Sequence, residues 1–145
     1  MTKNIYLRQL KGNTFAAKSN SHHWVVMDTK SEAGGMEGAS TPKELLLAAL
    51  AGCTSMDVIP ILKKKRAPVV AYECNVSGEE AEEHPKIFKT IHLEYVFYGD
   101  GIKTEDVERA IELSRTKYCS VSAQLSASAE ITHSYRIEPA AKATE

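Results

Sequence analysis

The sequence predicts an α+β fold whose strands and helices follow in the order βββ-α-ββ-α-β. Segments of alternating apolar and polar residues, typical of half-buried strands, lie on both sides of a long apolar stretch that begins near Pro42. A second, amphipathic stretch follows Gly101 and precedes a last alternating segment. No internal repeat or linker is visible, so we expect residues 1–145 to form a single domain.

The N-terminal region is predicted to be an antiparallel meander of three strands. Its segments are "NIYLRQL", "TFAAKS" and "HWVVMD", and Lys11-Gly12-Asn13 supplies the first turn. The small, polar and glycine-rich stretch 30–40 then predicts a mobile loop.

The start of the long helix has a clear local signature. Thr41 is the expected N-cap, and Pro42 suits the first helical position. Glu44 stands where the carboxylate of a capping box reaches back to the cap N–H. The helix is therefore predicted to begin here and to run to about Lys65.

This helix is expected to be buried on every side, because its apolar residues spread around the whole helical wheel. One sheet from so short a chain covers only one helix face, so we expect an obligate homodimer in which the helix packs against its symmetry mate. The residues concerned are Leu45, Leu46, Leu47, Leu50, Val58, Ile59, Ile61 and Leu62.

The C-terminal half is predicted to contain a hairpin, a helix and a final strand. Residues 69–79 and 87–99 alternate as two strands joined by an acidic loop. Thr104 is the expected cap of a second helix, a short helical piece follows at 118–125, and residues 129–137 form the last strand. Residues 139–145 are expected to be a frayed tail.

Composition argues against several classes of partner. The formal net charge is -1 and the pI is about 6.5, which disfavours nucleic acid and acidic membrane surfaces. The N-terminus lacks a secretory signal and no apolar stretch is expected to reach membrane-spanning length, so we predict a cytoplasmic protein without membrane contact. In that reducing compartment the three cysteines are expected to be thiols.

Cys53 lies on the long helix among alanine and glycine residues, which allows two interpretations. The small neighbours permit close helix packing with Cys53 as a small core residue, or they leave room for a small ligand beside the sulfur. Asp57, one turn on, needs a partner such as a backbone N–H or a lysine, and its charge would raise the pKa of a nearby thiol.

The other two cysteines differ in their expected surroundings. Cys119 lies near a helix break, where the N–H groups of a new short helix would lower its pKa, or it is simply buried in a turn. Cys74 alternates in a strand and is interpreted as structural. A metal site of Cys74 with His84 or His92 has little support, since the spacing fits no known ligand set, and we predict neither metal nor cofactor.

The stretch "TPKELLLAALAGCTSMDV", followed much later by "KYCSVSAQL", resembles the two cysteine signatures of the OsmC/Ohr family, the osmotically induced and organic-hydroperoxide-resistance proteins. The match is closer to the OsmC-like branch than to the Ohr branch. The resemblance implies an intertwined homodimer with long central helices packed between antiparallel sheets.

The resemblance also implies a cysteine-based thiol peroxidase that reduces organic hydroperoxides. Cys53 matches the peroxidatic cysteine and Cys119 the resolving one, so a cellular dithiol reductant would be required. An apolar site at a dimer interface would favour organic hydroperoxides over hydrogen peroxide.

Two positions depart from the Ohr pattern. The residue after the helix-start proline is Lys43, and the acid comes one later at Glu44, which either serves in catalysis or only caps the helix. No arginine matches in the N-terminal meander, where His22 and His23 either contact the thiolate or peroxide or are ordinary surface residues. The alternative function is a non-catalytic dimer that binds a small ligand or senses oxidants through a reversible disulfide.

Overall fold

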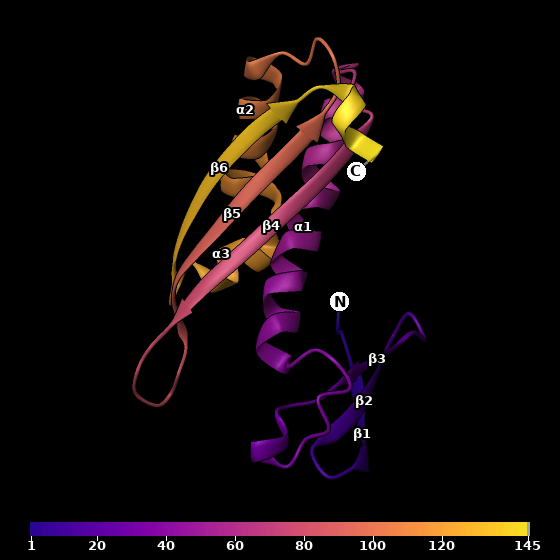
Figure 1. Cartoon of the computed structure of the whole chain (residues 1–145), viewed down its shortest axis with the longest axis vertical. Helices are drawn as coiled ribbons and strands as arrows, with labels where there is room; N and C mark the ends of the chain where they lie inside the picture. The colour runs from indigo at the N-terminus through magenta and orange to yellow at the C-terminus, as the bar shows by residue number, and fades with distance from the viewer. Residues whose placement is uncertain (145) are drawn as a thin grey trace. The chain divides into compact units, whose positions relative to one another are not determined.

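The computed structural model describes residues 1–144, which form two compact units, 1–46 and 47–144. The order of strands and helices is the predicted α+β order, with short 3₁₀ and π segments added between the main elements and after the last strand (Figure 1). Whether the chain behaves as a single domain stays a prediction.

The first unit contains the predicted meander. Strands β1 (Ile5–Lys11), β2 (Thr14–Ser19) and β3 (Trp24–Met27) pair in sequence order, and both pairs are antiparallel. The side chains of Ala16 and Ala17 on the middle strand are buried. The meander prediction is confirmed.

Asp28 holds the loop that follows β3, a loop predicted from its composition to be mobile. Its side chain is only 2% exposed and accepts N–H bonds from Thr29 at 2.8 Å, Met36 at 3.1 Å and Gly38 at 3.1 Å. Burial acts to raise the pKa of Asp28, but these N–H bonds together bring it below its ordinary value. One carboxylate therefore ties together both ends of the loop, which includes the 3₁₀ turn η1 (Ser31–Ala33).

The long helix α1 (Pro42–Lys64) begins with the predicted capping box. The Thr41 N–H donates to Glu44 Oε2 at 2.7 Å, and the Glu44 N–H donates to Thr41 Oγ1 at 3.3 Å. Each residue thus satisfies a backbone donor that the first helical turn leaves open.

The second unit is built on a sheet of three strands with β5 in the centre. Strands β4 (Ala71–Glu80) and β5 (Phe88–Tyr98) form the predicted antiparallel hairpin. Strand β6 (Glu130–Glu138) runs parallel to β5, so the expectation of purely antiparallel sheets is wrong for this sheet. The chain between β5 and β6 is a helical crossover, and such a crossover returns the chain in the same direction.

The crossover contains α2 (Thr104–Leu113), the π-helical segment η2 (Ser114–Tyr118) and α3 (Ser120–Leu125), and it lies with α1 on one face of the sheet (Figure 1). Thr104 is the first residue of α2, and the N-cap is Lys103, so the cap prediction is wrong by one position. The core between helices and sheet includes Leu50, Val58, Leu62, Ile91, Leu93, Phe97, Val107, Ala110 and Ile111.

Within one chain, α1 buries a single stripe of its surface. Leu50, Thr54, Val58 and Leu62, spaced four apart, are its buried residues, whereas Met56 is 78% exposed. The predicted burial on every side is therefore not reached by one chain. Because a helix that is apolar all round needs cover all round, the uncovered apolar side chains of α1 are available to a partner.

By length and composition, α1 is also long and apolar enough to cross a membrane, so the expectation that no stretch reaches such a length is wrong. The observation is weak evidence for a membrane span, because a core helix of a soluble protein passes the same test.

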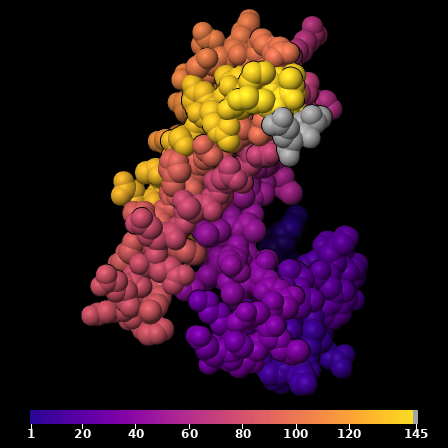
Figure 2. All heavy atoms as spheres, in the orientation of Figure 1, coloured from indigo at the N-terminus to yellow at the C-terminus, as the bar shows by residue number. Residues whose placement is uncertain are grey.

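Two peripheral segments complete the second unit. The acidic β4–β5 connection extends beyond the ends of both strands (Figure 1), and its atoms form a protruding lobe in the space-filling view (Figure 2). Residues Ala140–Thr144, within the expected tail, form the 3₁₀ turn η3, and the Ala140 N–H donates to Asp100 Oδ1 at 3.2 Å. Residue 145, the last of that expected tail, lies outside the described residues.

Candidate functional site

Cys53 and Cys119 lie together in the second unit. Cys53 is half-buried on α1, and Cys119 occupies the N-cap position of α3, where the backbone turns extended between η2 and the new helix. The two thiols lie close enough for Cys53 to raise the pKa of Cys119, and both are free cysteines. The residues that carry the two sequence signatures, 66 positions apart, are thus neighbours in the fold.

The surroundings of Cys119 keep it protonated near neutral pH. Its side chain is 4% exposed, and burial raises its pKa to about 11, with the Cys53 thiol and the negative charge of Asp57 acting in the same direction. The Ser122 N–H, which donates to Cys119 Sγ at 3.4 Å, opposes this effect. The predicted N–H contact at the helix start exists, but the lowered pKa is wrong, because burial outweighs one weak hydrogen bond. The alternative, a cysteine buried in a turn, is confirmed.

A buried chain of polar groups runs beside the thiol pair. The Tyr95 hydroxyl lies 2.8 Å from Thr54 Oγ1, and Thr54 Oγ1 lies 2.9 Å from Ser114 Oγ. Ser114 Oγ in turn donates to Asp57 Oδ2 at 2.9 Å. Asp57 therefore finds its partner in a serine hydroxyl, whereas the sequence suggested a backbone N–H or a lysine.

This chain connects three parts of the second unit. Thr54 and Asp57 belong to α1, Tyr95 to the central strand β5, and Ser114 to the junction between α2 and η2. Tyr95 and Ser114 are fully buried and Thr54 is 3% exposed. Burial raises the pKa of Tyr95 to about 12, so its phenol keeps its proton.

Sequence reasoning missed Tyr95 and the role of the Ser114 hydroxyl. The signal for Tyr95 was its position in a strand that alternates toward the core, and the signal for Ser114 was a polar residue on the otherwise apolar stripe of the second predicted helix. Neither pattern reveals which hydroxyls meet, because the contacts join residues 41 and 60 positions apart.

Cys74 has a separate environment. Its half-buried thiol interacts with the hydroxyls of Tyr72 and Ser55, which lie 2.9 Å from each other. Burial raises the pKa of Cys74, and the two hydroxyls partly counteract this. Among residues 1–144, no three side chains of His, Cys, Asp or Glu lie close enough together to hold a metal ion.

Glu44, His22 and His23 belong to the first unit. Glu44 Oε2 binds both the N–H and the hydroxyl of Thr41, which fully explains its position as a cap. His22 is exposed in a left-handed backbone conformation at φ 64, and His23 Nδ1 lies 3.2 Å from Ser21 Oγ. A role of these three residues at Cys53 stays a prediction.

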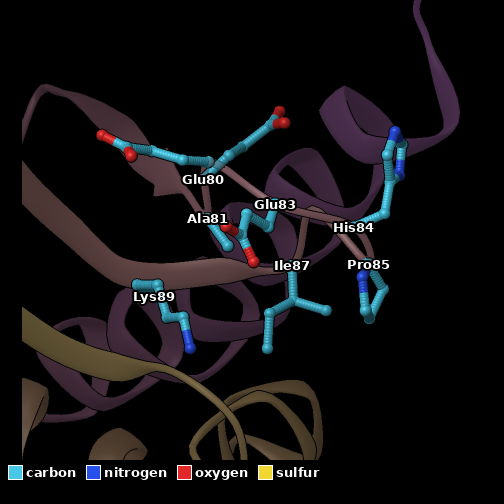
Figure 3. A pocket seen from close by; sticks show the side chains of 8 residues that line it. Glu80, Ala81, Glu83, His84, Pro85, Ile87 and Lys89 are labelled. Carbon is cyan, nitrogen blue, oxygen red and sulfur yellow. The ribbon is translucent and has the colours of Figure 1, made fainter.

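A surface hollow of about 590 Å³ is located elsewhere, at the β4–β5 connection (Figure 3). None of the predicted site residues lines it. Its lining comprises Glu80, Ala81, Glu82, Glu83, His84, Pro85, Ile87 and Lys89.

The sequence model of the OsmC-like protein family matches residues 34–134, a span that includes both cysteines of the pair. The chain belongs to the OsmC-like family. "Protein YhfA" of Escherichia coli K12 is 38% identical over 131 residues, covering 90% of this chain and 95% of YhfA. The name of that relative states no activity.

Two solved structures, one of them of an Ohr protein, share the fold. A hypothetical protein from Aquifex aeolicus has a TM-score of 0.84 and 31% identity, over 96% of this chain and 98% of its own. The organic hydroperoxide resistance protein OhrB of Bacillus subtilis has a TM-score of 0.60 at 18% identity, over 94% of this chain and 98% of its own. The α+β architecture of this OsmC-like chain is thus the architecture of the family.

The environment of Cys119 predicts slow alkylation of this thiol near neutral pH. In the reduced protein, the rate at which iodoacetamide labels Cys119 should still be rising at about pH 10, because the reactive thiolate forms only near the raised pKa. Asp57→Asn should move the curve to lower pH, since it removes a negative charge. Labelling is measured by mass spectrometry of the Cys119 peptide, and a plateau reached below about pH 8.5, the ordinary thiol value, would contradict this.

Proposed function

We propose that this OsmC-like protein is a thiol peroxidase that reduces organic hydroperoxides, with Cys53 as the peroxidatic and Cys119 as the resolving cysteine. The observation that carries the proposal is the proximity of the two thiols, which is close enough for Cys53 to raise the pKa of Cys119. Similarity of fold to proteins named for organic hydroperoxide resistance supports the same chemistry.

The reaction needs only these two sulfurs, a peroxide and a reductant. The Cys53 thiolate attacks one peroxide oxygen, the O–O bond breaks, and the alkoxide takes up a proton and leaves as an alcohol. Cys53 is then a sulfenic acid. The Cys119 sulfur attacks it, the S–S bond forms, and the hydroxyl leaves with the Cys119 proton as water. A cellular dithiol returns both residues to thiols and is itself oxidised to a disulfide.

The difference in burial between the two cysteines suits these two roles. The half-buried Cys53 is the one that a peroxide can reach, whereas the buried Cys119 is shielded and stays a thiol until Cys53 is oxidised. Cys53 packs against the apolar core cluster, which includes Leu50, Val58 and Phe97. An apolar environment favours the alkyl group of an organic hydroperoxide, because its burial is favourable by about 25 cal/mol per Å².

The active form in this proposal is a homodimer in the cytoplasm. The uncovered apolar side chains of α1, with Met56 the most exposed of its large ones, match the requirement for a second copy of the same helix. The first unit also presents Ile5, Leu7 and Trp24 on its surface, which adds apolar area for such a partner.

A non-catalytic dimer that binds a small ligand or senses oxidants is the second candidate. The observation in its favour is Glu44, whose carboxylate is bound to Thr41 in the capping box. If the cap is the whole role of Glu44, the acid that the Ohr pattern uses near the thiolate has no counterpart at that position.

Steady-state turnover tests the peroxidase. The protein should consume cumene hydroperoxide in the presence of dithiothreitol, and Cys53→Ser should lower the rate by more than about a hundredfold, since it removes the nucleophile. Peroxide loss is followed with a ferrous colour assay. Cys74→Ser is the matched control and should keep the native rate to within about twofold.

A consumption rate that Cys53→Ser leaves unchanged would eliminate Cys53 chemistry. Absence of turnover in the native protein, together with a peroxide-induced disulfide, would instead favour the sensor.

A charged substitution at Met56 tests whether the protein forms the proposed homodimer. Met56→Glu should weaken self-association by about tenfold or more, because a charge would be placed in an apolar interface. Sedimentation velocity at micromolar concentration gives the fraction of dimer, and Ile87→Glu, on the projecting β4–β5 connection, serves as the control. A native protein that sediments as a folded monomer at that concentration would rule out the obligate dimer.

A further inference from the structure

We propose that the buried hydroxyl chain from Tyr95 through Thr54 and Ser114 to Asp57 is a positioning device that holds Cys119 against Cys53 for disulfide formation. This inference rests on the proposed function for its biological purpose. Its physical content, the geometry of the thiol pair, can be measured without a peroxide.

The direction of each hydrogen bond in the hydroxyl chain follows from Asp57, the acceptor at its end. A carboxylate only accepts, so the Ser114 hydroxyl uses its one proton on Asp57 Oδ2. Ser114 Oγ must then accept from Thr54, and Thr54 Oγ1 must accept from the Tyr95 hydroxyl. All three protons point toward Asp57, an arrangement in which each bond polarises the next.

Ser114 connects the hydroxyl chain to Cys119 through its own backbone. Its side chain is bound to α1 through Thr54 and Asp57, while its backbone carbonyl accepts the Cys119 N–H at 2.8 Å. The backbone between them is a single π-helical turn, which spans Ser114–Tyr118. Because Cys53 and the two polar residues belong to the same helix, fixing Ser114 on α1 also fixes where Cys119 meets that helix.

The location of the π turn supports a specific role. A π segment inserted at the end of a helix is rare and frequently found at functional sites. Here it ends at Cys119 and directs the chain into α3, whose Ser122 N–H donates to the sulfur. The Cys119 sulfur is therefore held by its own backbone on one side and by the first turn of α3 on the other.

Full burial makes the hydroxyl chain sensitive to single-atom changes. An unpaired hydroxyl in the core loses its water without gaining a partner, and repacking to relieve this would move Ser114 from α1. Thr54→Val removes the central hydroxyl at nearly constant shape, whereas Thr54→Ser keeps the hydroxyl and loses a methyl group. Comparison of these two variants separates the effect of the Thr54 hydrogen bonds from the effect of its packing.

The test is the effective concentration of the Cys53–Cys119 pair in the full-length protein, measured in buffers of reduced and oxidised glutathione. Thr54→Val and Ser114→Ala should lower it by about tenfold, which corresponds to about 1.4 kcal/mol. Thr54→Ser should stay within about twofold of the native protein. Ser128→Ala, which removes an exposed hydroxyl bound to a carbonyl, is the matched control. Peptide mass spectrometry gives the disulfide fraction.

Should Thr54→Val fail to fold, Tyr95→Phe and Asp57→Asn test the two ends of the same chain by the same measurement, and at least one of them should lower the effective concentration. The inference is overturned if these variants match the native protein, if Thr54→Ser falls as far as Thr54→Val, or if the native protein forms no Cys53–Cys119 disulfide in glutathione. A native-like disulfide without peroxide turnover would refute the proposed function and leave the positioning role intact.

Discussion

The contact between α1 and η2, the segment that follows α2, determines where Cys119 lies relative to Cys53. Through Ser114, that segment is hydrogen-bonded to Thr54 and Asp57 on α1, in a core where polar groups must be satisfied by one another. The bonds place the following turn, and with it Cys119, beside Cys53. Two thiols that are remote in the sequence become a pair because a part-buried carboxylate and three buried hydroxyls are hydrogen-bonded to one another beside them.

The same burial makes the two cysteines chemically unequal. Cys119 lies almost completely out of solvent, with a negative charge and a second thiol nearby, and each of these surroundings raises its pKa. Cys53 is more open to solvent. In the proposed reaction this order is useful, because a shielded thiol is protected from peroxide and acts only on the sulfenic acid that forms next to it.

The order of strands and helices could be predicted from local patterns. The capping box at Thr41 and Glu44 is encoded within four residues, and the strands show a clear alternation of apolar and polar residues. The helix start and the strands could therefore be predicted from the sequence. The pairing of Cys53 with Cys119 was expected only through the family resemblance. It depends on tertiary packing, which no spacing along the chain reveals. Two interpretations of Cys119 stayed open, a pKa lowered by a helix start or simple burial in a turn, because a helix start is visible in the sequence and burial is not; the structure supports burial.

Two further differences have physical causes of the same kind. The parallel pairing of β6 with β5 follows from the helical crossover between them, a feature of topology that an alternating pattern does not specify. The apolar surface of α1 was read correctly from the helical wheel, yet one chain covers only the stripe from Leu50 to Leu62. The apolar side chains of α1 that lie outside this stripe are the strongest structural support for a homodimer.

The proposed peroxidase requires Cys53 and Cys119 to form one disulfide when the protein reacts with a peroxide. Peptide mapping by mass spectrometry after addition of one equivalent of tert-butyl hydroperoxide to the reduced protein tests this most directly. The predicted result is a Cys53–Cys119 bridge with Cys74 left as a free thiol. A bridge that includes Cys74, or a Cys53 sulfenic acid that persists beside an unreacted Cys119, would contradict it.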